Sequence, residues 1–213
     1  MRFNAIKRGL AIGSTAIGAA LACSALLAIA GPAAPPTGEW NFQALLDGTP
    51  IGHHRFSVTG QGDERKVVSE ANFQVKFLGF SAYTYRHKAT EHWQGECLTA
   101  LNSTTDDDGK PESVRADRND PTLKGCVMSF AYWNPAIQTQ SKLLNAQTGK
   151  LESVQVKRVG SGSVEVRGKP VEATEFRITG AASPIVVWYS AQGEWVGLDS
   201  TVAGGRKLSY RLQ

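Results

Sequence analysis

Residues 67–77 read VVSEANFQVKF. Apart from Val68 and Ser69, apolar side chains alternate with polar ones, and this period of two is the pattern of a β-strand with one buried face. Residues 54–59 (HRFSVT) and 208–212 (LSYRL) alternate in the same way. The sequence therefore predicts antiparallel strands, each with one face toward a core.

Turn signals that contain glycine follow one another at short intervals. Many short strands with such spacing predict an all-β fold, an antiparallel meander that forms a barrel or half-barrel. We expect at most one or two short helices, and the segment that favours one begins at Asn134-Pro135 and runs through Leu144, because proline suits a first helical position. The turn signals are Asp47-Gly48, residues 60–63 (GQGD), Asp108-Gly109, Thr148-Gly149, residues 160–162 (GSG), Arg167-Gly168, Gln192-Gly193 and Gly204-Gly205.

The start of the chain has the pattern of an export signal. Three basic residues precede an apolar run, residues 10–30, which ends in the small-residue triplet Ala28-Ile29-Ala30. Signal peptidase cuts after triplets of this kind. We therefore expect a signal peptide over residues 1–30, a proline-rich spacer over 31–37 and a single β-rich domain over 38–213.

An export signal predicts a mature protein outside the cytoplasm, which is the periplasm if the cell is Gram-negative. Two alternatives are open. Residues 20–23 (ALAC) weakly match a lipidation motif, which would make Cys23 an acylated N-terminus. The apolar run 10–30 is also just long enough to stay uncleaved as a membrane anchor. The membrane is thus expected as a partner only through the leader or through Cys23.

Charge and cysteine content limit the partners further. The leader holds three of the four net positive charges, so the rest of the chain is close to neutral and lacks the field that steers proteins to nucleic acid. Outside the leader only Cys97 and Cys126 remain, and two thiols in an exported protein usually form a disulfide. A redox or metal-binding pair is the alternative, but no C-x-x-C spacing supports it.

Residues 83–93 (YTYRHKATEHW) form a predicted strand that carries most of the candidate residues for a functional site. One face is plainly polar and solvated, so the other should point inward, although it carries an imidazole and a carboxylate. His54 should point inward from an adjacent strand. The candidate ligand-binding residues are therefore His54, Tyr83, Tyr85, His87, Glu91 and Trp93.

Each candidate has a structural alternative. His54, His87 and Glu91 would suit a metal or acid–base cluster, but a satisfied interior hydrogen-bond network is favoured because no recognised metal motif is present. The acidic run from Asp106 to Asp108 is interpreted as a hydrated hairpin tip because it lacks the ligand spacing of a calcium loop. The aromatic side chains that we expect on strands, Phe130 and Tyr132 among them, fill either a plain core or a ligand cavity. We assign no catalytic residue, metal or cofactor.

Several motifs are familiar. They are residues 91–98 (EHWQGECL), 126–135 (CVMSFAYWNP), 143–149 (LLNAQTG) and 188–196 (WYSAQGEWV), with the opening segments 40–48 and 51–56. Together they resemble an uncharacterised family of exported Gram-negative proteins, known only as a domain of unknown function. The resemblance implies a β-rich envelope protein and names no catalytic residue. More loosely, the chain is similar to the half-barrels of periplasmic lipoprotein and lipid carriers.

The leading functional hypothesis is a non-catalytic binding or carrier domain for a lipid or another apolar or amphipathic molecule, because aromatic inner faces occur here without a nucleophile motif. One alternative is an envelope enzyme that uses His87 as base and Glu91 as acid. Another is a structural or assembly partner in the envelope that pairs through an exposed strand edge.

Overall fold

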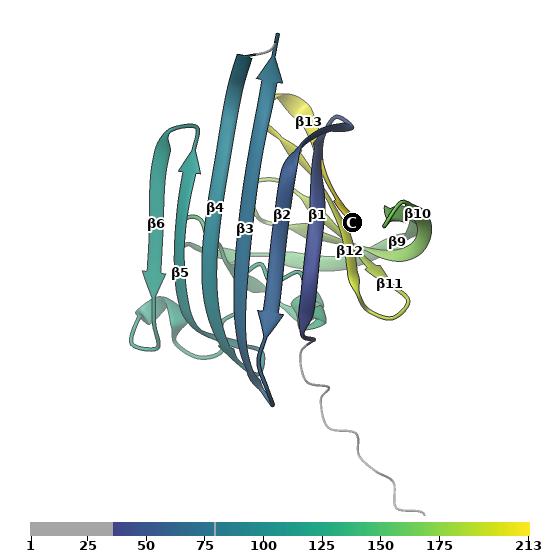
Figure 1. The fold of residues 1–213 in the computed structure, drawn as a ribbon. Helices are drawn as coiled ribbons and strands as arrows, with labels where there is room; N and C mark the ends of the chain where they lie inside the picture. Colours follow the sequence, from purple (N-terminus) through teal and green to yellow (C-terminus); the bar gives the residue numbers. More distant parts are fainter. Residues whose placement is uncertain (1–35, 79) are drawn as a thin grey trace, which may run out of the picture. The chain divides into compact units, whose positions relative to one another are not determined.

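An eleven-stranded antiparallel sheet dominates the structure, a computed structural model that describes residues 36–78 and 80–213 (Figure 1). The order of its strands is β6-β5-β4-β3-β2-β1-β13-β12-β11-β10-β9. Its strands are β1 (Gly38–Leu46), β2 (Thr49–Thr59), β3 (Glu64–Phe77), β4 (Phe80–Gln94), β5 (Cys97–Asp107), β6 (Lys110–Ala116), β9 (Gln155–Val166), β10 (Lys169–Thr179), β11 (Ile185–Ser190), β12 (Trp195–Val202) and β13 (Arg206–Leu212).

The prediction of an all-β fold that forms a barrel or half-barrel is confirmed, and the structure is the half-barrel. β1 pairs with both β2 and β13, which joins the two ends of the domain in the middle of the sheet. β6 and β9 are the edges, so the sheet curls without closing. The expected signal peptide, residues 1–30, and most of the expected spacer, residues 31–35, lie outside the described residues.

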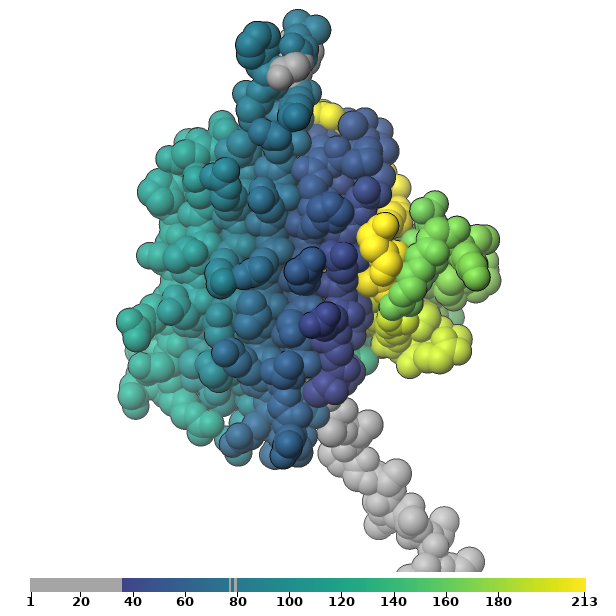
Figure 2. Space-filling view, viewed as in Figure 1, coloured from purple at the N-terminus to yellow at the C-terminus, as the bar shows by residue number. Residues whose placement is uncertain are grey.

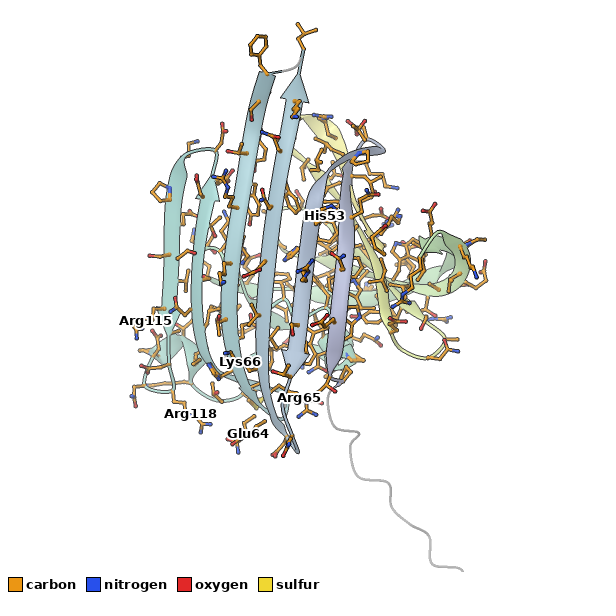
Figure 3. All side chains as sticks on the ribbon, viewed as in Figure 1. His53, Glu64, Arg65, Lys66, Arg115 and Arg118 are labelled. Atoms are coloured by element: carbon orange, nitrogen blue, oxygen red, sulfur yellow. A yellow bond between two sulfur atoms is a disulfide. The ribbon has the colours of Figure 1, made fainter. Side chains whose placement is uncertain are left out.

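The sheet has one apolar and one polar face, as the alternation predicts. On the inner face the tilted rings of Phe42 and Trp195 pack together with centroids 4.3 Å apart, and both side chains are fully buried. On the outer face His53, Lys66 and Arg115 project into solvent from β2, β3 and β6 (Figure 3). This arrangement leaves the inner face as the place for the core and for a cavity.

The turn signals fall between strands as expected, except residues 160–162 (GSG), which lie inside β9 and pair with β10. Asp47-Gly48, Asp108-Gly109 and Arg167-Gly168 each link two strands with two residues whose φ angles are all positive. Such turns match the right-handed twist of the strands, and glycine adopts positive φ without strain. The acidic run that ends at Asp108 is therefore a hairpin tip, and the Asp106 carboxylate accepts a hydrogen bond from the Gly109 amide at 2.7 Å.

Because consecutive strands run in opposite directions, the turns alternate between two ends of the sheet. The upper end in Figure 1 carries the β1–β2, β3–β4 and β5–β6 turns. The pairing order also places the β10–β11 loop (residues 180–184) and the β12–β13 turn, the 3₁₀ segment η3 (Ala203–Gly205), at the upper end. By the same alternation, the other hairpin turns join the opposite ends of these strands.

The connection from β6 to β9, residues 117–154, covers part of the inner face. It contains two 3₁₀ segments, η1 (Pro121–Leu123) and η2 (Pro135–Thr139), and a small ribbon of β7 (Lys142–Leu144) and β8 (Leu151–Ser153). Trp133 is buried and meets Trp93 of β4 edge-to-face at 5.5 Å. The connection therefore supplies a second wall of the core, facing the sheet.

Two expectations about this connection are wrong. The helix expected over 135–144 is only η2, which the Asn134 side chain caps by accepting a hydrogen bond from the Ala136 amide at 3.0 Å. It stops at Thr139 because residues 142–144 pair with β8 and bury Leu143 and Leu144 completely. Phe130 and Tyr132, expected on a strand, lie outside the strands, in the wall opposite the sheet.

Cys97 and Cys126 form a disulfide, as the sequence predicts. The bond ties the start of β5 to the connection, and next to it the Leu98 amide donates a 2.8 Å hydrogen bond to the Val127 carbonyl. The disulfide therefore holds the second wall against the sheet.

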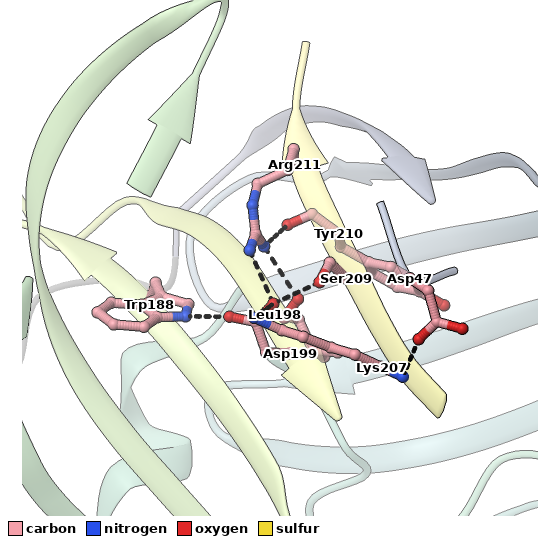
Figure 4. Close-up of polar contacts among 8 residues, drawn as sticks. All are labelled: Asp47, Trp188, Leu198, Asp199, Lys207, Ser209, Tyr210 and Arg211. Carbon is pink, nitrogen blue, oxygen red and sulfur yellow. Dashed lines mark hydrogen bonds and ion pairs between the residues drawn. The ribbon is translucent and has the colours of Figure 1, made fainter. Parts of the chain in front are cut away.

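A polar network around Asp199 fixes the C-terminal strands (Figure 4). The Asp199 carboxylate on β12 accepts hydrogen bonds from the Ser209 hydroxyl at 2.7 Å, the Arg211 guanidinium at 2.8 Å and the Trp188 indole at 2.9 Å. Burial by itself raises the pKa of Asp199, but these hydrogen bonds and the Arg211 charge hold the pKa below its ordinary value. The network thus joins β11, β12 and β13 through one carboxylate.

Candidate functional site

Small side chains at the centre of the inner face open a cavity. Ser69 of β3 and Ala89 of β4 line it beside larger neighbours such as Phe56. These two small residues lie opposite each other on paired strands, and they leave space that the facing wall does not fill. The resulting cavity has a volume of about 320 Å³, at the lower end of the range for small-molecule sites.

Two histidines face each other across Ala71 in this cavity. The register pairs Ala71 with His54 of β2 on one side and with His87 of β4 on the other. Side chains that lie opposite each other on neighbouring strands share a face of the sheet. The row continues through Thr105 of β5, so four consecutive strands contribute to it.

His54 is held by hydrogen bonds through both ring nitrogens. Its Nε2 lies 2.8 Å from the Ser69 hydroxyl and its Nδ1 lies 3.3 Å from the Tyr210 hydroxyl. Its ring also packs on Phe56, with centroids 4.1 Å apart. Burial, with a smaller effect of His87, lowers the pKa of His54 to about 3. The imidazole is therefore neutral at physiological pH.

His87 has one ring nitrogen bonded and one available. Its Nδ1 lies 2.8 Å from the Thr105 hydroxyl. Nε2 makes no hydrogen bond to any residue in the described part of the chain, so it is left for a ligand in the cavity that His87 lines. Burial lowers the pKa of His87, which favours the neutral ring.

Glu91 is the buried carboxyl group of the cavity. It is 7% exposed, the Trp93 indole donates a 3.0 Å hydrogen bond to it, and Ser129 hydrogen-bonds to the same group. Burial raises the pKa of Glu91 to about 7, against the opposite effect of the Ser129 and Trp93 hydrogen bonds. The carboxyl group is therefore mostly protonated, and uncharged, below neutral pH.

The wall opposite the sheet comes from the connection. Phe130, Ala131 and Tyr132 line the cavity from that side. The Tyr189 hydroxyl donates a 2.8 Å hydrogen bond to the Tyr132 carbonyl, and the Tyr85 hydroxyl donates one of 3.1 Å to the Gln147 side chain. These bonds link the wall to the sheet.

The cavity opens to solvent at the upper end of the sheet. Residues 181–183 of the β10–β11 loop and 200–202 at the end of β12 line it there, and Ala182 and Thr201 are exposed. Among residues 36–78 and 80–213, no lysine or arginine lines the cavity. Its polar groups are hydroxyls, amides, neutral imidazoles and two carboxyl groups, Glu91 and Glu152, of which Glu152 accepts a hydrogen bond from Asn145 at 2.8 Å.

The structure brings together four of the six candidate residues: His54, Tyr85, His87 and Glu91 line the cavity. Tyr83 and Trp93 do not. The Tyr83 hydroxyl donates to Asp107 at 2.7 Å near the upper end, and buried Trp93 supports Glu91 from the side. The register of this strand is as expected, with Glu91 buried and His92 exposed.

Sequence reasoning missed three polar partners, Ser69, Thr105 and Tyr210. The sequence does mark Ser69, because it is the one polar residue on the otherwise apolar face of residues 67–77. Tyr210 lies in the strand predicted over residues 208–212, but nothing in the sequence indicates that its hydroxyl contacts His54. As for metals, no group of three or more His, Cys, Asp or Glu side chains within residues 36–78 and 80–213 is placed to hold an ion.

Comparison with known families gives the classification. Residues 42–213 match the model of DUF6134, described as a domain of unknown function. The chain belongs to this family. The match confirms the resemblance to an uncharacterised β-rich family and covers nearly the whole sheet, from β1 to β13.

One solved structure is similar to this DUF6134 protein in fold. It is the crystal structure of a β-barrel-like protein of the domain of unknown function DUF1849 from Brucella abortus, with a TM-score of 0.59 over 85% of this chain and 98% of that chain. The two sequences are 11% identical, so the similarity concerns the fold alone. The comparison with curated proteins found no match. Among the described residues, no helix is long and apolar enough to cross a membrane.

The raised pKa of Glu91 gives a test of the cavity's electrostatics in this DUF6134 protein. From pH 4.5 to about 7 the native state keeps a proton that the unfolded chain has lost, so Glu91 lowers stability as the pH rises through that window. His54 acts in the opposite direction between pH 3 and 6.5, because its pKa is lowered. Both the wild type and Glu91→Gln contain His54, so its contribution cancels in the difference between their free energies of unfolding. The pH dependence that remains in this difference comes from Glu91.

We expect the stability of the wild type relative to Glu91→Gln to fall by up to about 3 kcal/mol between pH 4.5 and 8. Urea unfolding of both proteins across this range measures the difference, and Glu165→Gln, at an exposed position on β9, is the control for loss of a carboxylate. A difference that stays constant over the range would show that Glu91 is not desolvated.

Proposed function

We propose that this protein is a binding domain of the cell envelope that holds a small, uncharged amphipathic molecule in the cavity beneath β2, β3 and β4. The observation that carries the proposal is the cavity itself, which is ligand-sized, open at one end and lined by both apolar and polar side chains. Sites for small molecules combine mostly apolar walls with a few placed polar groups in this way.

The lining favours an uncharged ligand. An anion would find no lysine or arginine there, and the imidazoles of His54 and His87 are neutral. A cation would find Glu91 mostly protonated below neutral pH, and the second carboxyl group, Glu152, already hydrogen-bonded to the Asn145 side chain. Burying a charge without a partner costs several kcal/mol, whereas a hydroxyl or carbonyl group needs only a hydrogen bond. His87 Nε2 can make that bond, and the Phe130–Tyr132 wall can cover the apolar part.

Calorimetric titration tests the ligand class directly. The probes are a medium-chain monoacylglycerol and the fatty-acid anion and alkylammonium ion with the same chain, all at pH 6. We expect the monoacylglycerol to bind at least about tenfold more tightly than either ion, which corresponds to about 1.4 kcal/mol. Tighter binding of the carboxylate would contradict the proposal, since the cavity would then contain a cationic group.

His87→Phe should lower the affinity for monoacylglycerol on the order of tenfold, because the substitution removes one hydrogen bond while it keeps an aromatic ring. His92→Phe is the matched control. It lies on the same strand, on the solvent face, and should leave binding unchanged.

A catalytic alternative rests on one observation, the 2.8 Å distance from the Ser69 hydroxyl to His54 Nε2. A serine and a histidine in such contact can act as nucleophile and base. The low pKa of His54 opposes this, because the ring is a poor proton acceptor. The third group is the Tyr210 hydroxyl instead of a carboxylate. The earlier candidates, His87 and Glu91, hydrogen-bond to Thr105 and Trp93.

A fluorophosphonate probe that labels activated serines distinguishes the two functions. The binding domain should remain unlabelled after prolonged incubation at pH 8. Labelling of the wild type that Ser69→Ala abolishes would establish the catalytic alternative.

A further inference from the structure

The β3–β4 hairpin extends beyond the rest of the sheet. β2 pairs with β3 only as far as Phe73, and β5 pairs with β4 only from Tyr85 onward, but β3 and β4 continue to pair until Phe77 and Phe80. Four residues of β3 therefore project past their outer neighbour, roughly 13 Å at strand spacing. The space-filling view shows this projection standing above the neighbouring hairpins (Figure 2).

The base of the projection is braced. The Tyr83 hydroxyl donates a 2.7 Å hydrogen bond to Asp107, and Thr84 and Asp108 exchange backbone and side-chain hydrogen bonds at 2.8 and 3.3 Å. These contacts come from the β5–β6 turn. The hairpin is thus held at its root while its apex stands clear.

The apex presents apolar side chains to solvent. Leu78 is 82% exposed and Phe80 is 78% exposed, well above the other large exposed apolar residues, Leu151 and Val159, at 40% and 46%. Residues 74–84 contain a single charged residue, Lys76, which is exposed, and no acid. The apex is therefore apolar with one positive charge just behind it.

The apex lies at the same end of the sheet as the mouth of the cavity. The β3–β4 turn is at the upper end, and so are residues 181–183 and 200–202, which line the opening. A surface that held the apex would thus face the end at which the cavity opens.

We propose that the β3–β4 apex docks this protein onto a phospholipid surface, with Leu78 and Phe80 entering the apolar boundary and Lys76 facing the lipid phosphates. An interfacial segment enters a bilayer by about 5–10 Å, which the projection is long enough to supply. Lys76 matches the negative charge of anionic lipids, and no acid on the projection opposes it.

A protein partner or a second copy of this chain fits the apex less well. A stable protein interface buries about 800 Å² on each side, whereas the apolar apex consists of a few side chains on a narrow ribbon. A bilayer needs no complementary shape. This docking does not depend on the ligand of the cavity, and the soluble titration with monoacylglycerol tests that ligand separately.

The experiment places an environment-sensitive fluorophore at the apex through Leu78→Cys. Cys23 is replaced by alanine in the full chain, while Cys97 and Cys126 remain bonded. Val159→Cys, on β9 at the edge of the sheet, carries the control fluorophore. With vesicles of phosphatidylglycerol and phosphatidylethanolamine, we expect emission from position 78 to rise several-fold and to be quenched by spin-labelled lipid, without change at position 159.

Adding Phe80→Ser to the labelled Leu78→Cys chain should weaken the response to vesicles on the order of tenfold, because one large apolar side chain no longer enters the lipid. A response at position 78 that equals the response at 159, or no response at either, would overturn the proposal. So would a response at 78 that follows protein concentration without vesicles, since the apex would then bind a second copy.

Discussion

Replacing Cys97 and Cys126 together by serine should lower the free energy of unfolding by about 3–4 kcal/mol. The two cysteines are 29 residues apart, and closing a loop of that length removes this much chain entropy from the unfolded state. In the folded state the bond anchors the irregular connection of residues 117–154 to β5. Urea unfolding of the wild type and the double variant under oxidising conditions measures the difference.

A reductant provides the control for this prediction. It should destabilise the wild type by a similar amount and leave the double variant unchanged, because the variant has no disulfide to reduce. Wild type and variant unfolding at the same urea concentration would contradict the prediction and would mean that the connection is held by packing alone.

Filling the cavity should abolish ligand binding. Ala71→Leu places a larger side chain between His54 and His87, two residues that line the cavity. We expect monoacylglycerol affinity to fall on the order of a hundredfold or more, as a loss of most apolar contacts requires. Stability should change by less than about 3 kcal/mol, the usual limit for an added side chain in a packed core.

The neighbouring position supplies the control. Asn72→Leu adds an apolar side chain to the same strand on the outer face and should leave affinity unchanged. Ala89→Leu fills the cavity from β4 and gives a second variant in case Ala71→Leu fails to fold. Normal affinity in a folded Ala71→Leu or Ala89→Leu protein would place the ligand elsewhere.

Much of the sheet could be predicted because the patterns that specify it, side-chain alternation and turn residues, each lie within a short stretch of sequence. The alternation in residues 67–77 and 83–93 set which side chains face inward, and the Asp-Gly turns fixed where strands end. Whether the curled sheet closes depends on the pairing of β6 with β9, two strands separated by the long connection. No local pattern encodes that pairing, so barrel and half-barrel could not be separated.

Two features were harder to predict, for different reasons: the structure of the connection, and the extent of the cavity along β4. Residues 117–154 have no period because their buried side chains, such as Trp133 and Ile137, come from irregular backbone. Along residues 83–93, alternation gives the face but not the position relative to the cavity. Tyr83 and Trp93 share the inward face with His87, yet they lie beyond the two ends of the cavity lining.

Native mass spectrometry shows whether the cavity holds a ligand when the protein is purified without detergent from the cells that make it. We expect a discrete small-molecule adduct on the wild type, which collisional activation releases as an uncharged species and which Ala71→Leu lacks. A wild type with only the mass of the polypeptide, before and after incubation with monoacylglycerol, would mean that the cavity binds no such ligand.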